Sequence, residues 1–583
     1  MAKTTVNGIT FEYNVETDET TGEGYAVITD IEFAGKTTTG IEYVDLEIPV
    51  EIKGRPVMYI GESAFSNRIG LTSVTIPDSV TRIGMSAFHD CTGLKSVTIG
   101  HGVKLIEECA FDSCCKLRNV VIPDSVTRIS EHAFSNCSSL TNITIGSGVT
   151  SIGKYAFRDC TSLKSVTIPD NVTNIGYGAF SGCSGLTSVT IGDGVTSIGW
   201  AAFENCTKLT NMTIPDSVTG LGSFAFRDCT RLTSVEMGNG VTHIGTKTFS
   251  GCGKLQSITI GDSVSIVASS AFENCGNSLF NTKTIPGVKL VDGWVVGYTN
   301  SLTGDLSLTG VRGIGESAFA GCTGLTSVVV GNGIARIGER TFYHCSGLTS
   351  VTIPDGVTSI GNSGFSGCGN LTNARIPDSV TNIGSYAFDG CSYSLFDMKT
   401  LPGVKLLDGW VVGCDKSFSG DLDLSGIRGI CGGAFANCTS LTNVMIPDSV
   451  TSIGPNVFSG CRSLTSVTIP DSVTSIGAKA FYSCKGLKSI MIPDSVTSIG
   501  DEAFVCCSLK NVSLPKHLEG NLPDNAFEGD SKITYRAKSA AMAAPKVEGG
   551  KEKSAPAKKP AAKGPASKKP AAKKAVKKTA KKK

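Results

Sequence analysis

A phenylalanine returns every 23 residues along most of this chain. The series runs from Phe65 to Phe272, resumes at Phe319 and at Phe435 after gaps of 47 residues, and closes at Phe527. Of the 25 phenylalanines, 19 occupy this one position. A short fixed period is typical of repeat proteins, in which no unit buries its own core and stability comes from stacked neighbours. The sequence therefore predicts a solenoid of about twenty coils, although 583 residues would otherwise suggest several domains.

Each unit reads A-F-x-x-C-x-x-L-x-x-V-x-I-P-D-S-V-T-x-I-G, as in residues 480–500. In residues 94–99, buried-type Val97 and Ile99 alternate with polar residues, which is the period-two pattern of a half-buried strand. The Pro-Asp-Ser or Gly-Asp-Gly that follows predicts a turn, and a second short extended piece comes after it. We expect a short helical or irregular turn around Ala-Phe, with the Phe rings piled between coils. The predicted fold class is a mainly β repeat solenoid with short helical turns on its convex side.

Departures from the period divide the chain into parts. Residues 1–60 lack the repeat and are predicted to be β-strands that cap the first coil, while residues 61–507 form the repeat array. Two-coil inserts are expected at residues 273–318 and 389–434; they contain near-identical segments 116 residues apart, one with Trp294 and one with Trp410. Residues 508–536 are predicted to be a degenerate last coil, and residues 537–583 a separate tail.

The tail differs from the rest of the chain in charge. Residues 537–583 hold 16 lysines and two glutamates, a net charge of +14, while residues 1–536 hold 37 basic and 49 acidic side chains, a net charge of −12. High charge with little apolar surface predicts disorder. Lysine ammonium groups can neutralise phosphates and release counterions, which predicts salt-sensitive binding of nucleic acid or another polyanion. A solubilising arm, or an intramolecular partner for the acidic body, is the alternative.

The lysine-rich pattern resembles the tails of linker histones and of lysine-rich bacterial nucleoid proteins. The candidate polyanion-binding residues are Lys558, Lys559, Lys563, Lys568, Lys569, Lys573, Lys574, Lys577, Lys578, Lys581, Lys582 and Lys583.

Cysteine follows the same period as phenylalanine. Of the 22 cysteines, 17 lie three residues after a repeat Phe. Equivalent positions in stacked strands lie about 4.8 Å apart, whereas the Cβ atoms of a disulfide lie about 3.8 Å apart. We therefore expect free thiols buried between coils, and a reducing compartment. The other five cysteines leave room for a thiol pair or a metal, although no C-x-x-C pattern accompanies them. The predicted structural ladder includes Phe88, Phe111 and Phe134 with Cys91, Cys114 and Cys137.

Residues that could perform catalysis do not converge in this sequence. The six histidines occupy different repeat positions, and the neighbours His344 and Cys345 would not aim both groups at one substrate atom. Turn aspartates such as Asp78 and Asp124 recur, but the Gly-Gly-x-Gly-x-Asp repeat of calcium-binding rolls is absent from the sequence, and turn chemistry accounts for them. The sequence therefore predicts no enzyme, no cofactor and no metal site.

Outward positions of the predicted concave strands form a broad polar surface. About twenty strands at about 4.8 Å would extend roughly 100 Å, with hydrogen-bonding groups along the whole length. A protein, a glycan or an ice-like lattice could fit this surface; alternatively, Ser and Thr are only soluble strand formers. The candidate ligand-facing residues are Ser73, Thr75, Ser96, Thr98, Asn142, Thr144, Ser165, Thr167, Ser188 and Thr190.

The repeat consensus L-x-x-V-x-I-P-x-x-V-T-x-I-G-x-x-A-F-x-x-C resembles the BspA-like leucine-rich-repeat family over residues 40–530. The resemblance implies a right-handed, gently curved solenoid that acts in adhesion or protein recognition, often at a bacterial or protist surface, without catalytic residues. Many members of the family begin with an export signal. The first residues here lack its apolar run, and no stretch of the sequence approaches the roughly 20 apolar residues that span a bilayer.

We therefore expect a cytoplasmic binding scaffold whose solenoid recognises a protein or polymer ligand and whose tail binds nucleic acid or another polyanion. The alternative is an exported or cell-surface adhesin, released by a non-classical route, whose tail contacts anionic envelope polymers. Whether Trp294 and Trp410 belong to binding features is left open by the sequence.

Overall fold

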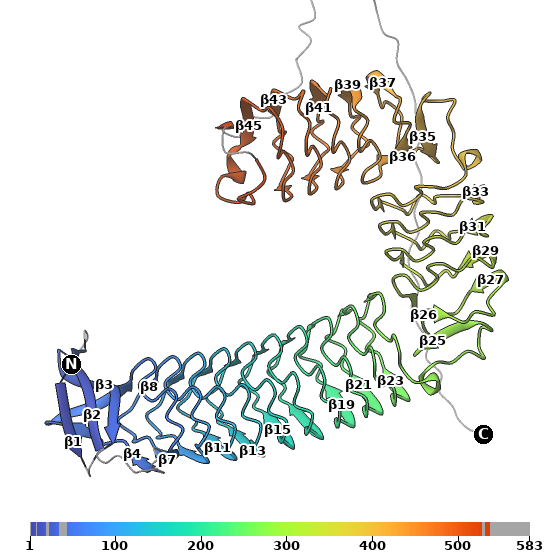
Figure 1. Cartoon of the computed structure of the whole chain (residues 1–583). Coiled ribbons are helices and arrows are strands. Elements are labelled where there is room, and N and C mark those ends of the chain that lie inside the picture. The colour runs from blue at the N-terminus through green and yellow to red at the C-terminus, as the bar shows by residue number, and fades with distance from the viewer. Residues whose placement is uncertain (1, 7–8, 19–21, 34–43, 528–530, 537–583) are drawn as a thin grey trace, which may run out of the picture. The chain divides into compact units, whose positions relative to one another are not determined.

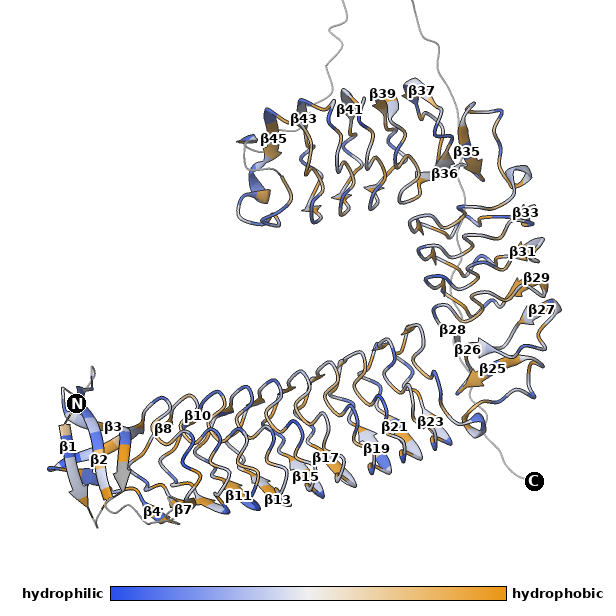
Figure 2. Ribbon diagram, viewed as in Figure 1, coloured by the Kyte–Doolittle hydropathy of each residue, from blue (hydrophilic) through white to orange (hydrophobic). Residues whose placement is uncertain are grey.

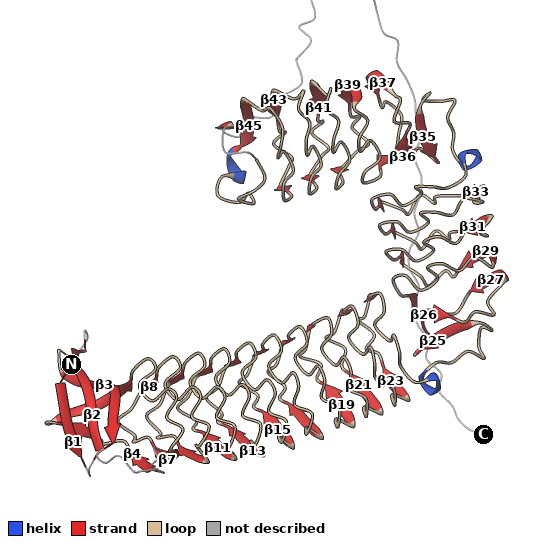
Figure 3. Cartoon of the chain, in the orientation of Figure 1, coloured by secondary structure: helices blue, strands red, loops and turns tan. Residues whose placement is uncertain are grey.

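The computed structural model describes residues 2–6, 9–18, 22–33, 44–527 and 531–536 (Figure 1). Over these ranges the chain forms the predicted solenoid, built from stacked parallel strands. Helix in the described ranges is limited to three short 3-10 turns, η1 (Asn277–Leu279), η2 (Tyr393–Leu395) and η3 (Lys516–Leu518) (Figure 3). The predicted disorder of residues 537–583 lies outside the described residues.

The N-terminal strands supply the edges on which the first coil stacks. They are β1 (Ala2–Val6), β2 (Ile9–Thr17), β3 (Gly24–Phe33), β4 (Val44–Glu47), β5 (Glu51–Ile52) and β6 (Arg55–Ile60). β1, β2 and β3 pair antiparallel, and β3 pairs in parallel with β6. β6 then pairs with the first two-residue strand of the array, while β4 pairs with its first longer strand.

Each regular coil contributes one longer strand and one two-residue strand, and both stack in register on the next coil. Val120 lies opposite Ile143, and Ile106 opposite Ile129, each 23 residues further on. Hydrophobic and hydrophilic residues alternate along the strands, as Figure 2 shows, so that one side of each strand faces the interior.

Before the first insert, the longer strands are β7 (Leu71–Thr75), β9 (Ser96–Thr98), β11 (Asn119–Ile122), β13 (Asn142–Ile145), β15 (Ser165–Ile168), β17 (Ser188–Ile191), β19 (Asn211–Ile214), β21 (Ser234–Met237) and β23 (Ser257–Thr259). The two-residue strands are β8 (Arg82–Ile83), β10 (Leu105–Ile106), β12 (Arg128–Ile129), β14 (Ser151–Ile152), β16 (Asn174–Ile175), β18 (Ser197–Ile198), β20 (Gly220–Leu221), β22 (His243–Ile244) and β24 (Ile266–Val267).

The same two rows continue after each insert. The row of longer strands contains β27 (Gly304–Leu308), β29 (Leu325–Val330), β31 (Ser350–Thr352), β37 (Ser419–Asp423), β39 (Ser440–Met445), β41 (Ser466–Thr468), β43 (Ser489–Met491), β45 (Asn511–Pro515) and β46 (Lys532–Arg536), and in the same row β33 (Asn373–Ala374) is shortened to two residues. The two-residue strands are β28 (Gly313–Ile314), β30 (Arg336–Ile337), β32 (Ser359–Ile360), β34 (Asn382–Ile383), β38 (Gly429–Ile430), β40 (Ser452–Ile453), β42 (Ser475–Ile476) and β44 (Ser498–Ile499).

The repeat phenylalanines form stacked columns in the interior, as predicted. Neighbouring ring centroids lie between 4.9 and 5.6 Å apart, with planes inclined by 2 to 17°. Phe88, Phe111 and Phe134 are fully buried. Such aromatic pairs add about 0.5–1.5 kcal/mol each to the free energy gained by burial. The columns therefore stabilise each coil through both of its neighbours.

The turn that holds each Phe takes the irregular form rather than the helical one. In the coil of Phe88, both Ser86 and Asp90 have positive φ, at 54° and 55°. Such left-handed residues on either side of the Phe interrupt any right-handed helix. The backbone N–H of Phe88 instead donates to the carbonyl of Ala110 in the next coil, at 2.8 Å. The short helices expected at this position are therefore replaced, in the described coils, by hydrogen bonds between coils.

At each gap of 47 residues the regular coil gives way to an antiparallel hairpin. The hairpin strands are β25 (Val288–Val291) with β26 (Trp294–Tyr298), and β35 (Val404–Leu407) with β36 (Trp410–Cys414). β26 and β36 then pair in parallel with the two-residue strands β28 and β38. Each hairpin thus connects one stretch of coils to the next.

An acid and an arginine close the strand edge that each hairpin leaves behind. The Asp292 carboxylate accepts a hydrogen bond from the N–H of Ile260, at 2.8 Å, and Arg312 donates to the Ile260 carbonyl, at 3.0 Å. In the second copy Asp408 and Arg428 make the same contacts with Ile376, at 2.7 and 3.2 Å. We call each Asp–Arg pair an edge plug, because it satisfies backbone groups that an unpaired strand would expose.

Candidate functional site

The ten predicted ligand-facing residues lie in two adjacent rows of one parallel sheet. This sheet has the strand order β17-β15-β13-β11-β9-β7-β4. Ser73 lies opposite Ser96, Thr75 opposite Thr98, and Asn142 opposite Ser165. Nine of the ten are exposed, and Ser73 is half-buried. We call these two rows, together with the β11 residues between them, the polar strand face.

The sequence prediction skipped β11, which completes both rows. Asn119 is exposed in the Ser/Asn row and accepts a hydrogen bond from Asn142, at 2.8 Å. Val121 lies in the Thr row with 61% of its surface exposed, so an apolar patch interrupts the hydroxyls there. The period itself identifies both residues, because each lies 23 residues after a predicted one.

Threonines at two positions of the repeat have different roles. At the start of the longer strands, the hydroxyls of Thr141, Thr187 and Thr233 donate to carbonyls of the preceding coil, at 2.9 to 3.0 Å. In the Thr row of the polar strand face, the side-chain hydroxyls make no hydrogen bond with other described residues; they are Thr75, Thr98, Thr144, Thr167 and Thr190. The first group therefore stabilises the fold, while the second keeps its hydrogen-bonding capacity for solvent or a ligand.

Charged residues border the polar strand face on both sides. A basic residue precedes the Ser/Asn position of several strands, and an aspartate follows the strand in the next turn. The exposed basic row contains Lys95, Arg118 and Lys164, and the exposed acidic row contains Asp78, Asp124 and Asp170. A ligand on this face would therefore meet positive charge at one edge and negative charge at the other, which favours one orientation.

The turn aspartates are hydrogen-bond acceptors for the next coil. Asp78 accepts from the backbone N–H of His101, and Asp124 from that of Ser147, both at 2.7 Å. Hydrogen bonds from the Ser147 backbone and hydroxyl lower the pKa of Asp124. These bonds give the aspartates a structural role. Among the residues that the structure describes, groups of three or more His, Cys, Asp or Glu that could hold a metal ion are absent.

The cysteine ladder is a second hydrogen-bonded column beside the Phe rings. The Sγ of Cys91, Cys114 and Cys137 lies 3.0 to 3.3 Å from the carbonyl oxygen of the Phe 26 residues earlier. The thiol S–H therefore donates to a carbonyl of the preceding coil. All 22 cysteines are free thiols. Burial raises the pKa of the Cys91 thiol to about 12, so it stays protonated and retains the donor at neutral pH.

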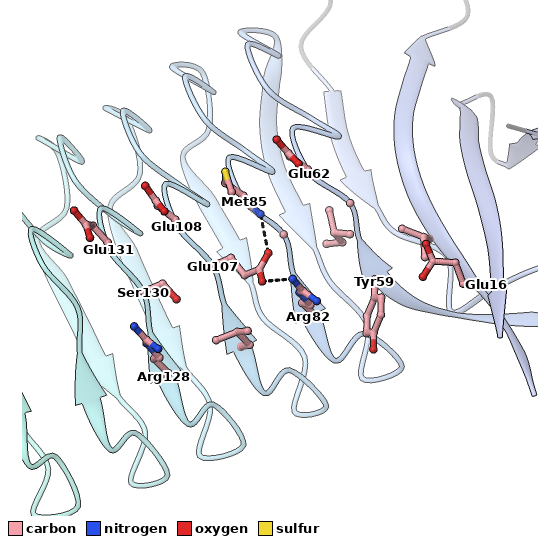
Figure 4. A pocket seen from close by; sticks show the side chains of 15 residues that line it. Glu16, Tyr59, Glu62, Arg82, Met85, Glu107, Glu108, Arg128, Ser130 and Glu131 are labelled. Atoms are coloured by element: carbon pink, nitrogen blue, oxygen red, sulfur yellow. Dashed lines mark hydrogen bonds and ion pairs between the residues drawn. The ribbon is translucent and has the colours of Figure 1, made fainter. Parts of the chain in front are cut away.

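A shallow groove of about 570 Å³ lies beside the N-terminal strands, on the side of the two-residue strands (Figure 4). Glu62, Met85, Glu108 and Glu131 come from four successive turns along it, while Arg82 and Arg128 lie on the strands below. Arg82 forms an ion pair with Glu107, whose carboxylate also accepts from the N–H of Met85, at 3.0 Å. The sequence analysis did not predict this groove, although most of its lining residues recur at the 23-residue period. Its described lining contains no paired nucleophile and base.

The candidate lysines of residues 558–583 lie outside the described part of the chain. In the described part, no helix is long and apolar enough to cross a membrane.

Comparison with known proteins identifies the repeat. A sequence model of the family described as "BspA type Leucine rich repeat region (6 copies)" matches residues 58–187, 150–279, 304–405 and 422–535. No curated protein matches the chain.

Three solved structures illustrate the similarity. A leucine-rich repeat protein from Bacteroides ovatus is 24% identical over 90% of this chain and 98% of its own, with a TM-score of 0.38. The leucine rich repeat protein of T. pallidum is 31% identical over 36% of this chain and 91% of its own, with a TM-score of 0.31. A leucine rich cell surface protein from Faecalibacterium prausnitzii is 26% identical over 88% of this chain and 94% of its own, with a TM-score of 0.30.

Proposed function

Because the chain belongs to the BspA-type leucine-rich-repeat family, we propose that it is a non-enzymatic scaffold whose polar strand face binds an extended protein or polymer ligand. The observation that supports this is the Thr row, whose exposed hydroxyls have no partner among the described residues. Parallel strands repeat about every 4.8 Å, so an extended ligand along the polar strand face meets a new pair of side chains in each coil, and both are polar except in the coil of Val121.

The affinity of such a surface grows with the length of the ligand. A single hydrogen bond contributes only about 0.5–1.5 kcal/mol, because it replaces one made with water. A ligand that spans several coils adds these small contributions and is oriented by the charged rows at the two borders. The surface therefore favours a long, repetitive partner over a small molecule.

The test is affinity capture from the native cell with the full chain as bait. The triple variant Thr144→Arg, Thr167→Arg and Thr190→Arg places bulk and charge on the polar strand face. A control variant, Asn174→Arg with His243→Arg, changes exposed residues of β16 and β22 on the two-residue strands. We expect the triple variant to lose the ligand that the control retains; capture unchanged by the triple variant would contradict the proposal.

For the tail we propose that residues 537–583 bind nucleic acid or another polyanion. Support comes from its charge of +14. Each phosphate neutralised contributes about −0.9 to the slope of log affinity against log salt concentration for duplex DNA. Retention of the full chain on DNA should therefore fall steeply with salt and disappear when residues 537–583 are deleted. Retention that persists without these residues, or that salt does not change, would refute it.

We also propose the cytoplasm as the location, with the cell surface as the alternative. The ladder thiols support a reducing compartment, because the S–H groups of residues such as Cys91 and Cys114 donate to carbonyls and oxidation would remove those donors. Fractionation of native cells tests this, and detection exclusively outside the membrane would reverse it.

A further inference from the structure

The hydrogen bonds that join the Phe-bearing turns of successive coils are interrupted at the first hairpin. In the coils before it, the backbone N–H of each repeat Phe donates to a carbonyl of the next coil, as from Phe249 to Ala271, at 2.9 Å. The N–H of the left-handed residue two positions later does the same, as from Gly251 to Glu273, at 2.8 Å. Phe272 is followed by the hairpin instead of a regular coil, so its turn lacks this partner.

Unpaired backbone groups remain on both sides of this interruption. Before the hairpin, the N–H groups of Phe272 and Asn274 have no acceptor among the described residues. After it, the carbonyls of Glu316 and Ala318 have no donor in the described part of the chain, although the same two positions of the next coil accept hydrogen bonds at 2.9 Å. Phe272 and Ala318 are buried. Buried backbone groups are nearly always paired, so donors on one side and acceptors on the other call for a partner that carries both.

A groove of about 470 Å³ lies at the interruption. All four residues with unpaired groups line it, and the hairpin supplies most of the remaining lining, including the half-buried rings of Phe280 and Tyr298. The ring centroid of Tyr298 lies 6.4 Å from that of Phe319, whereas regular neighbours in the columns lie 4.9 to 5.6 Å apart. The aromatic column is therefore looser here, and the groove offers ring surface beside the backbone donors and acceptors.

The second hairpin interrupts the turns in the same way, but there the gap is narrower. At the base of each gap the coils before and after the hairpin are joined, by the N–H of Glu316 to the Val267 carbonyl, at 2.8 Å, and by that of Gly432 to the Ile383 carbonyl, at 3.4 Å. At the second hairpin a further hydrogen bond, from the N–H of Tyr386 to the Gly432 carbonyl, at 3.1 Å, joins the two coils again. The corresponding bond is missing from the described residues of the first hairpin.

Glycine residues account for this difference between the hairpins. A Cβ at Gly432 would lie 3.0 Å from the backbone N and Cα of Ser385, and one at Gly433 would lie 2.8 Å from the tyrosine ring of the opposite turn. The first hairpin has Glu316 and Ser317 at these two positions, and each carries a Cβ. The two coils cannot approach as closely there, so the first gap stays open.

The combination of donors and acceptors selects the chemistry of the ligand. An anion would use only the N–H groups of the groove, and a cation would use only its carbonyls. Peptide backbone carries both kinds of group, and in the regular coils a peptide turn occupies the same donors and acceptors. Main-chain hydrogen bonds to an extended segment are a common mode of peptide recognition, in which side-chain pockets add the specificity.

We propose that the groove at the first hairpin binds an extended peptide segment of a partner protein, which takes the place of the missing turn. Its carbonyls accept from the N–H groups of Phe272 and Asn274, and its N–H groups donate to the carbonyls of Glu316 and Ala318. An apolar side chain of the peptide packs against the aromatic rings of the lining. This groove is separate from the polar strand face, so either can fail its test without the other.

The test is amide hydrogen exchange of the full chain, read by mass spectrometry, with a capped nonapeptide as the probe. The peptide has the sequence of residues 176–184, a regular turn of this chain, with Cys183→Ser to prevent oxidation. A second peptide that also carries Phe180→Gly is the control for the apolar side chain. We expect the first peptide, at millimolar concentration, to slow exchange in residues 270–276 and to leave residues 386–392 unchanged.

A closing variant gives the first hairpin the residues of the second, namely Ser270→Tyr, Glu316→Gly and Ser317→Gly. The chain already accepts these residue types at the equivalent positions, where Tyr386 and Gly433 have φ of 57° and 69°. The variant should bind the peptide about tenfold more weakly or worse, as expected for the loss of two hydrogen bonds. The matched control, Glu131→Gly with His132→Gly in a regular coil, should keep the affinity.

Four outcomes with the peptides would overturn the proposal: no protection of residues 270–276; equal protection at both hairpins; equal affinity for the Phe180→Gly peptide; or unchanged affinity in the closing variant. Protection that grows with protein concentration when no peptide is present would identify a second copy of this chain as the occupant, and would overturn it as well.

Discussion

Replacing one phenylalanine in the middle of a column should cost far more stability than replacing the last one. Phe180 is fully buried, and its ring centroid lies 5.2 Å from that of Phe157 and 5.3 Å from that of Phe203. Phe527 is half-buried and stacks on Phe504 alone in the described chain, at 4.9 Å. Core Phe→Ala substitutions cost about 3–5 kcal/mol, and two stacked partners place Phe180→Ala near the top of that range.

For Phe527→Ala the expected loss of unfolding free energy is about 2 kcal/mol, because the side chain is only half-buried and has one stacked neighbour instead of two. The difference of about 3 kcal/mol corresponds to roughly a hundredfold difference in the equilibrium for local opening. Native-state hydrogen exchange measures that opening coil by coil, which matters because a repeat array need not unfold in a single step. Two results would refute the idea that neighbour contacts set the stability. One is an equal loss of unfolding free energy in both variants, and the other is a loss of exchange protection that is the same in every coil.

Three further outcomes follow from the hydrogen bonds between coils. Cys183→Val keeps the apolar volume but removes the thiol donor to the Phe157 carbonyl, which lies 3.1 Å from Sγ. Denaturant unfolding should therefore show a loss of unfolding free energy of about 1–3 kcal/mol. If there is no loss, the thiol contributes only its volume. The pKa of Asp124 is lowered in the folded state, so its contribution is present above the unfolded pKa and is lost as the pH falls through the folded one. Asp124→Ala should flatten the acid limb of the stability curve, and an unchanged acid limb would contradict this. Arg312→Ala removes the donor to the Ile260 carbonyl and exposes the strand edge at β23. Light scattering should then detect self-association through that edge. An unchanged size distribution would contradict this role of the edge plug.

The fold could be predicted from the sequence because its strongest contacts repeat with the sequence period. Residues 23 apart become neighbours in space, so the Phe columns and the rows of the polar strand face follow from spacing alone. The sequence could not decide between a helical and an irregular turn around each Phe, since the left-handed residues of the turn include types such as Tyr155 and Phe224 that give no local signal. The thiol's acceptor was missed because it lies 26 residues away and is a backbone atom.

The hairpins had a usable signal that the sequence analysis did not apply. Asp292-Gly293 lies between two apolar strands, and both residues have positive φ, at 46° and 79°. An Asp-Gly pair in this setting is typical of a two-residue hairpin turn. The packing of the Trp410 indole against Gly429 could not be predicted, because the two residues lie 19 positions apart in the chain and only the fold brings them together.

The edge plugs give each stretch of coils an end of its own. The groups that satisfy the last strand of a stretch come from the hairpin that follows it and from the residue just before the next two-residue strand, so each hairpin carries the cap for the coils before it. A block of 116 residues, bounded by one such terminus at each side, can therefore be inserted or deleted as a unit without exposing backbone. The length of this protein is in that sense adjustable in whole modules, and relatives with fewer or more blocks would remain stable.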